Sequence, residues 1–249
     1  WDWPSKIENT LIGENIMALP LLVTPEFRTK IPSTGQEIEY RPFLVKEEKV
    51  LYMALESNDE KDITSAVKKI LKACIISEVD INQLASFDVE YLFLQLRSKS
   101  VNEFMTFMLG HENEEECDSK TEISIDIDSI KIECKDDDKI VKIDDKLGFK
   151  MKYPTIDIGL KFKEESDLQK SLGMIYECIE FVFDEDDVYE DFTEKEMEEF
   201  IEKLSSTQLQ KLIGFFENMP KLQKKVSYKC EKCGKKEEYT FEGLNDFFT

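Results

Sequence analysis

Histidine and glycine are scarce in this sequence, with one histidine, His111, and nine glycines among 249 residues. A Ser-His-Asp or Cys-His catalytic mechanism would have to use His111. The sequence also contains no G-x-S-x-G elbow, no G-x-x-x-x-G-K-[ST] phosphate loop, no G-x-G-x-x-G fingerprint and no H-E-x-x-H motif. We therefore expect a protein that is not an enzyme.

Basic residues are outnumbered, with 33 Lys and Arg against 54 Asp and Glu and a formal net charge of −21. Nucleic acids and anionic membrane surfaces are bound through Lys and Arg that neutralise phosphate, so neither is an expected partner. No segment approaches the roughly 18 consecutive apolar residues of a membrane span, and the N-terminus lacks the pattern of a secretory signal. We expect a protein that is made and kept in a cytoplasm and binds other proteins.

The apolar fraction of 41% is that of a folded globular chain. Its patterning predicts an α+β fold: a mainly helical body, an inserted β-rich segment and a small C-terminal zinc-ribbon-like hairpin. Met17 reads like a natural start, which leaves the residues before it as an extension of uncertain origin. The expected segments are 1–16, the extension; 17–103, an N-terminal hairpin plus helices; 104–163, the β-rich insert with acidic loops; 164–222, a helical segment; and 223–249, a Cys-x-x-Cys hairpin with a short terminal helix.

Helical periodicity is clearest over 44–57, over the stretch after Asp59, and over 87–97. The last of these is apolar nearly all round, which favours a buried helix with Asp88 as N-cap, with a central strand as the alternative. Three capping boxes predict further helices. In the first of these helices, apolar residues recur at helical spacing as far as Ile179 and Phe183. These boxes are Ser166-x-x-Gln169, Thr193-x-x-Glu196 and Ser205-x-x-Gln208.

Two short alternating runs flank Cys230-Glu231-Lys232-Cys233-Gly234. This is the layout of a zinc knuckle, in which two thiolates bind one ion and the glycine permits a tight turn. Structural zinc takes four ligands, and His111 and Cys117 are the candidates for the other two. A metal-free hairpin with vestigial cysteines is the alternative, and a redox-active cysteine pair is disfavoured because the pair lies between two strands.

A run of acidic residues separates two of the predicted helices. It includes Asp184, Glu185, Asp186, Asp187 and Tyr189. It is either a solvated loop or a docking surface for a basic partner. It is not an EF-hand, because the loop has no glycine and Val188 occupies a ligand position.

Several longer stretches resemble one known family, the baseplate hub subunits and hub assembly proteins of T4-like bacteriophages. The resemblance rests on 18–25, Ile31-Pro32-Ser33-Thr34-Gly35, 40–49, 87–101, Met151-Lys152-Tyr153-Pro154, 215–222 and the closing Cys-x-x-Cys hairpin. It implies a non-enzymatic component or assembly factor of the central hub of a contractile-tail baseplate. The implied partners are other phage baseplate hub proteins, and the implied locations are the host cytoplasm during assembly and the virion tail baseplate.

The resemblance leaves two questions open. A permanent subunit and a transient assembly chaperone fit it equally. Members often carry a cysteine pair in the β-rich insert, where this chain offers His111 and Cys117 instead. The alternative function, drawn from the knuckle alone, is a zinc-binding enzyme or regulator.

Overall fold

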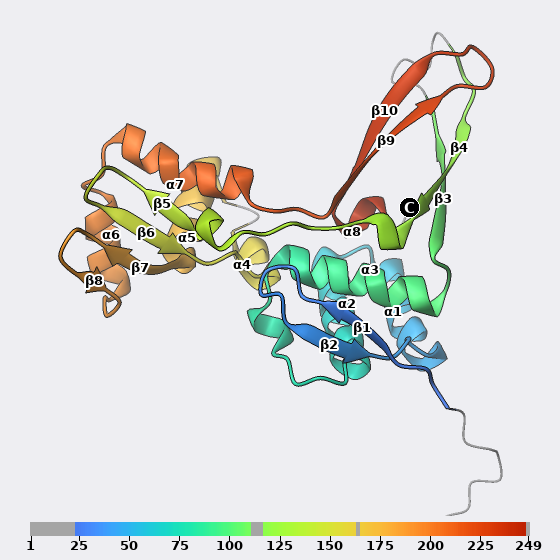
Figure 1. Ribbon diagram of the computed structural model, residues 1–249, viewed down its shortest axis with the longest axis horizontal. Helices are drawn as coiled ribbons and strands as arrows, with labels where there is room; N and C mark the ends of the chain where they lie inside the picture. The colour runs from blue at the N-terminus through green and yellow to red at the C-terminus, as the bar shows by residue number, and fades with distance from the viewer. Residues whose placement is uncertain (1–22, 111–116, 163–164, 248–249) are drawn as a thin grey trace, which may run out of the picture.

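The computed structural model describes residues 23–110, 117–162 and 165–247. Its N-terminal unit begins with a hairpin in which β1 and β2 pair antiparallel, Phe27 opposite Tyr40. Gly35 makes the turn with a φ of +70°, and its N–H donates to the Ile31 carbonyl at 2.8 Å. Three helices pack against this hairpin around one apolar core (Figure 1). The elements are β1 Phe27–Lys30, β2 Glu37–Tyr40, α1 Val45–Ser57, α2 Glu60–Cys74 and α3 Ser86–Ser100.

The α3 helix is the centre of the molecule. Its apolar side chains enter three separate cores: Phe93 packs in the N-terminal unit, Phe87 in a second unit and Leu94 in a third. The predicted buried helix is confirmed, but its predicted cap is wrong. Asp88 lies inside the first turn, fully buried, and its carboxylate accepts hydrogen bonds from the N–H groups of Ala85 and Ser33 and from the Ser33 hydroxyl. The side chain therefore ties the turn of the first hairpin to the start of α3.

The second unit is a four-stranded antiparallel sheet of order β5-β6-β7-β8, with helices α5, α6 and α7 beside it (Figure 1). Gly148 in β6 lies against the Phe183 ring, and a Cβ there would lie 2.2 Å from that ring unless the ring shifted. The predicted capping boxes at Thr193 and Ser205 are confirmed. Ser166 is the N-cap of α5 but donates to the Gln169 side chain instead of capping the backbone. The elements are β5 Ile140–Lys142, β6 Gly148–Met151, α5 Asp167–Cys178, β7 Ile179–Phe183, β8 Val188–Tyr189, α6 Glu194–Ile201 and α7 Ser206–Asn218.

The predicted mainly helical body with a single β-rich insert is wrong. The fold is α+β, but the strands of the described residues are distributed over four small sheets. Of these strands, β5 and β6 form one sheet with strands from the stretch predicted to be helical. The helix α5 ends at Cys178, and the chain passes directly into β7. A spacing of four residues, as between Ile179 and Phe183, puts side chains on one face of a helix and equally of a strand, so periodicity could not separate the two.

Two hairpins form the third unit, here called the arm. The β3–β4 and β9–β10 hairpins lie side by side and project away from α3, and the short helix α8 follows β10 at their base (Figure 1). Phe107 and Phe241, one from each hairpin, pack with ring centroids 4.5 Å apart, and Phe247 after α8 contacts both. The elements are β3 Phe104–Leu109, β4 Thr121–Asp126, β9 Gln223–Lys229, β10 Lys236–Glu242 and α8 Gly243–Asp246.

One short helix, α4 Ile156–Lys161, lies between the N-terminal and second units. Its Asp157 carboxylate pairs with the Lys68 ammonium of α2 at 2.6 Å. Within the described ranges, no helix is long and apolar enough to cross a membrane.

The carboxyl of Glu90, on α3, lies near Glu242 of β10. Burial, and then the charge of Glu242, raise the pKa of Glu90 from 4.5 to about 7. Between those values the folded state holds a proton that the unfolded state has lost, so stability falls as pH rises through this window. We expect Glu90→Gln to leave the free energy of unfolding little changed at pH 5 and to raise it by roughly 2–3 kcal/mol at pH 8.

Urea unfolding at the two pH values measures this difference. The matched control is Glu122→Gln, which makes the same substitution at an exposed position of β4. Equal effects of Glu90→Gln at pH 5 and pH 8 would contradict the assignment of a raised pKa.

Candidate metal centre

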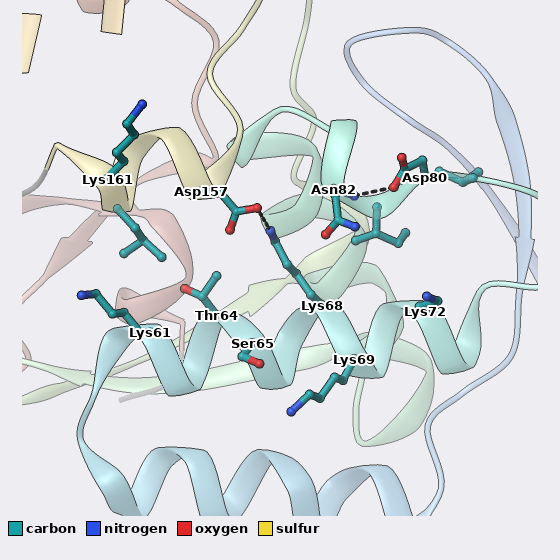
Figure 2. A pocket seen from close by; sticks show the side chains of 13 residues that line it. Lys61, Thr64, Ser65, Lys68, Lys69, Lys72, Asp80, Asn82, Asp157 and Lys161 are labelled. Carbon is teal, nitrogen blue, oxygen red and sulfur yellow. Dashed lines mark hydrogen bonds and ion pairs between the residues drawn. The ribbon is translucent and has the colours of Figure 1, made fainter. Parts of the chain in front are cut away.

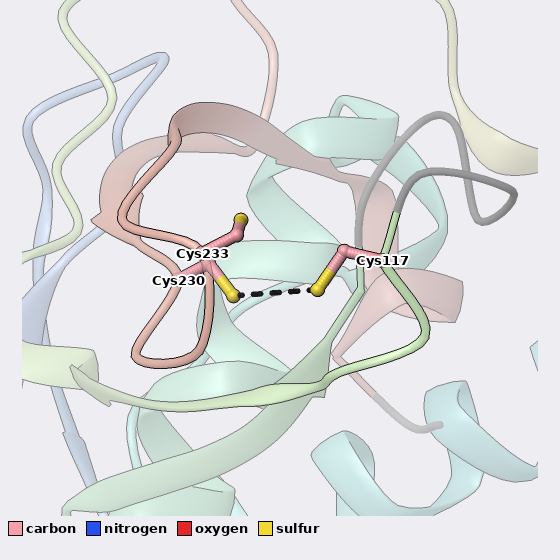
Figure 3. Close-up of side chains that lie close together, drawn as sticks. All are labelled: Cys117, Cys230 and Cys233. Carbon is pink, nitrogen blue, oxygen red and sulfur yellow. Dashed lines mark hydrogen bonds between the residues drawn. The ribbon is translucent and has the colours of Figure 1, made fainter.

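The far end of the arm brings three cysteines together (Figure 3). Cys117 precedes β4, and Cys230 and Cys233 lie in the turn between β9 and β10. The three Sγ atoms all lie within 4.8 Å of one another, and those of Cys117 and Cys230 are 4.0 Å apart. Cys117 and Cys230 are buried, whereas Cys233 is exposed. Two cysteines from one hairpin and one from the other therefore make a single cluster.

The local backbone explains how the β9–β10 turn presents two thiols. The N–H of Gly234 donates to the Cys230 carbonyl and the N–H of Cys230 to the Lys235 carbonyl, both at 2.9 Å. Gly234 has a φ of +75°, which glycine adopts without strain. The tight turn expected at Gly234 is thus present, and the Cys230 and Cys233 side chains both project from it.

Polar contacts hold the two hairpins together beside the cluster. The Lys232 ammonium pairs with the Asp118 carboxylate at 2.6 Å, and the Tyr228 hydroxyl donates to the Gly110 carbonyl. Each contact joins the β9–β10 hairpin to the segment between β3 and β4. These two contacts hold together the segments that carry the three cysteines.

The cluster fits a tetrahedral thiophilic ion. Zn–S bonds of about 2.3 Å place two sulfurs of a tetrahedron about 3.8 Å apart, close to the separation of Cys117 and Cys230. The N–H of Lys235 lowers the pKa of Cys233, but desolvation and the neighbouring thiols of Cys230 and Cys117 outweigh it, and the pKa lies above its ordinary value. Thiolates gathered in this way repel one another, and a bound cation would offset that repulsion.

The other predicted ligand, His111, lies outside the described residues, and its role stays a prediction. Cys74 and Cys178 are fully buried in the core, and burial raises their pKa values to about 11 and about 12. The contacts of Asp118, Lys232 and Tyr228 were not predicted. They carry no local sequence signal, because each joins residues more than 100 positions apart.

The predicted acidic surface is a structured turn between β7 and β8. The Asp184 carboxylate accepts hydrogen bonds from the N–H groups of Asp186 and Asp187 and from the Tyr189 hydroxyl, at 2.8–3.0 Å. These bonds, the two backbone ones first, lower the pKa of Asp184. Glu185 pairs with Lys146 at 3.2 Å.

Comparison with known protein families identifies the family of this chain. Residues 24–249 match the family described as T4 bacteriophage base plate protein. The chain belongs to that family. The match of this baseplate protein covers the N-terminal unit, the second unit and the arm with its three cysteines. No curated protein and no solved structure matches it.

Proposed function

We propose that the chain is a non-enzymatic component or assembly factor of the central hub of a contractile phage tail baseplate, acting through protein–protein binding. The observation that carries the proposal is the baseplate family match over 24–249. The acidic charge and the projecting arm support a binding role. The proposed partners are other phage baseplate hub proteins, met in the host cytoplasm during assembly and, for a permanent subunit, kept in the virion tail.

We further propose that Cys117, Cys230 and Cys233 hold one Zn²⁺, with His111 as the candidate fourth ligand. The ion would neutralise the thiolates and fasten the ends of the two hairpins, which is a structural role. The clustering of three sulfurs from two hairpins supports this assignment. A catalytic zinc needs a coordination position open to a water molecule. Three thiolates and a histidine would fill all four positions of a tetrahedral zinc, as in structural sites.

The experiment is affinity capture of the tagged chain from phage-infected cells, with mass spectrometry of the captured proteins and of purified virions. Hub proteins in the captured fraction are the expected result. The chain in finished particles identifies a permanent subunit, and its absence from particles identifies an assembly factor. Capture of no baseplate protein would overturn the proposal.

A further inference from the structure

A groove lined by lysines lies between α2, α4 and the loop that follows α2 (Figure 2). It has a volume of about 780 Å³. Lysines on α2 form one side, and Val79, Ile81 and Leu160 add apolar surface. We call it the lysine groove. Its basic residues are Lys61, Lys68, Lys69, Lys72 and Lys161, and its acidic residues are Asp80 and Asp157.

Three of these lysines have no acidic partner among the described residues: Lys61, Lys69 and Lys72. Lys68 instead points across the groove to Asp157 (Figure 2), and Lys161 pairs with Glu177. The three ammonium groups are gathered on one short helical stretch of a chain whose net charge is −21. A local excess of positive charge in so acidic a protein favours a carboxylate-rich occupant.

The turn between β7 and β8 has the complementary composition. Because the carboxylate of Asp184 is used within the turn, the outward charges are those of exposed residues such as Asp186, Asp187 and Glu190. Between them Val188 and Tyr189 are 57% and 48% exposed. The turn therefore presents carboxylates beside two exposed apolar side chains, and the lysine groove presents ammonium groups beside an apolar wall. The two surfaces are complementary. The internal hydrogen bonds fix the shape of the turn, which lowers the entropy cost of docking.

The turn cannot fill the groove of its own chain. β8 lies at the outer end of the second unit, whereas α2 belongs to the N-terminal unit (Figure 1). We propose that the acidic turn at 184–191 of one copy docks into the lysine groove of a second copy. Such a contact joins two different surfaces, so repetition of it makes a ring or an open helix of copies. It is separate from binding to other hub proteins and does not depend on it.

Nucleic acid is the poorer occupant of this groove. Asp80 and Asp157 lie among the lysines, and the field of the whole chain repels a polyanion. Two copies also repel each other at long range. That repulsion is screened beyond about 8 Å at physiological ionic strength, whereas ion pairs in direct contact are screened less. Association should therefore be strongest near physiological salt, weaker at very low salt and lost at about 1 M.

The test is analytical ultracentrifugation of the full chain and two charge-reversed variants. One carries Lys61→Glu, Lys69→Glu and Lys72→Glu; the other carries Asp186→Lys, Asp187→Lys and Glu190→Lys. Each alone should self-associate about tenfold or more weakly than the unaltered chain. Their mixture should associate again, because each supplies the surface that complements the other. That recovery also shows that both variants are folded.

The controls separate a local contact from overall charge. Lys131→Glu, Lys142→Glu and Lys236→Glu change three exposed lysines outside the groove and should leave association unchanged. The acidic-turn variant is less negative than the unaltered chain, so its loss of association cannot come from general repulsion. A monomer at every ionic strength, or unchanged association of the groove variant, would overturn the proposal. A further result would also overturn it: the unaltered chain is monomeric, and the groove variant no longer captures another baseplate protein. The occupant of the groove would then be that protein.

Discussion

Replacing Cys230 with serine is expected to abolish the zinc binding proposed for the arm. The unaltered chain, purified with zinc present, should carry about one ion per chain, and the variant should carry none that survives dialysis. The reason is that Cys230 lies 4.0 Å from Cys117 and is the more deeply buried half of the knuckle. Metal content by mass spectrometry and amide hydrogen exchange of the two hairpins measure the effect.

The loss should stay local. Exchange should accelerate near Cys117 and at the β9–β10 turn, while α1 to α3 remain protected, because the aromatic contacts at the base of the arm do not involve the ion. Cys134→Ser is the matched control, since Cys134 is a partly buried cysteine outside the cluster. A chain that binds no zinc before any substitution, or a Cys230→Ser variant that retains it, would show that the cluster is metal-free.

Truncating Phe241 is expected to cost the most stability of any change considered for the arm. Phe241 is 2% exposed, and its ring packs against Phe107, Tyr239 and Phe247 with centroids 4.5–5.6 Å away. Phe241→Ala removes that surface and leaves a cavity between the two hairpins. We expect a loss of about 3–5 kcal/mol in the free energy of unfolding, measured in urea.

The neighbouring residue gives the control for Phe241. Thr240 is exposed on the same strand, and Thr240→Ala should change stability by less than about 0.5 kcal/mol. If both substitutions cost equally little, Phe241 would not hold the hairpins together. Zinc binding should be weakened in the Phe241→Ala variant as well, because the two hairpins that supply its ligands would separate.

Local signals in the sequence are sufficient to predict an element whose structure depends only on residues close together in the chain. The all-round apolar pattern of α3 and the capping boxes at Thr193 and Ser205 depend on residues a few positions apart, and all of them are confirmed. The helix-to-strand change at Ile179 was missed, because a four-residue spacing is compatible with both periods. The pairing of β6 with β7 then decides for the strand, and that pairing is a tertiary contact.

The candidate sites also divide into those that local spacing predicts and those that depend on tertiary contacts. The spacing of Cys230 and Cys233 marks them as a pair in the sequence, whereas Cys117 is only a distant candidate there. The fold brings the three Sγ atoms within 4.8 Å of one another. The lysine groove was not predicted. The positions of Lys61, Lys68 and Lys72 mark one face of α2, but the remaining walls come from Val79 to Asn82 and from α4, which no spacing on α2 could indicate.

The order in which the arm is completed has a consequence for synthesis. The second unit is encoded between the two hairpins, so Cys117 leaves the ribosome 113 residues ahead of Cys230. At about 5–20 residues per second, Cys117 waits roughly 6–23 s for Cys230. During that interval the apolar face of β3 and the thiol of Cys117 are without the surface that later covers them. A nascent chain that has not yet formed β9 therefore exposes apolar surface that the completed arm buries.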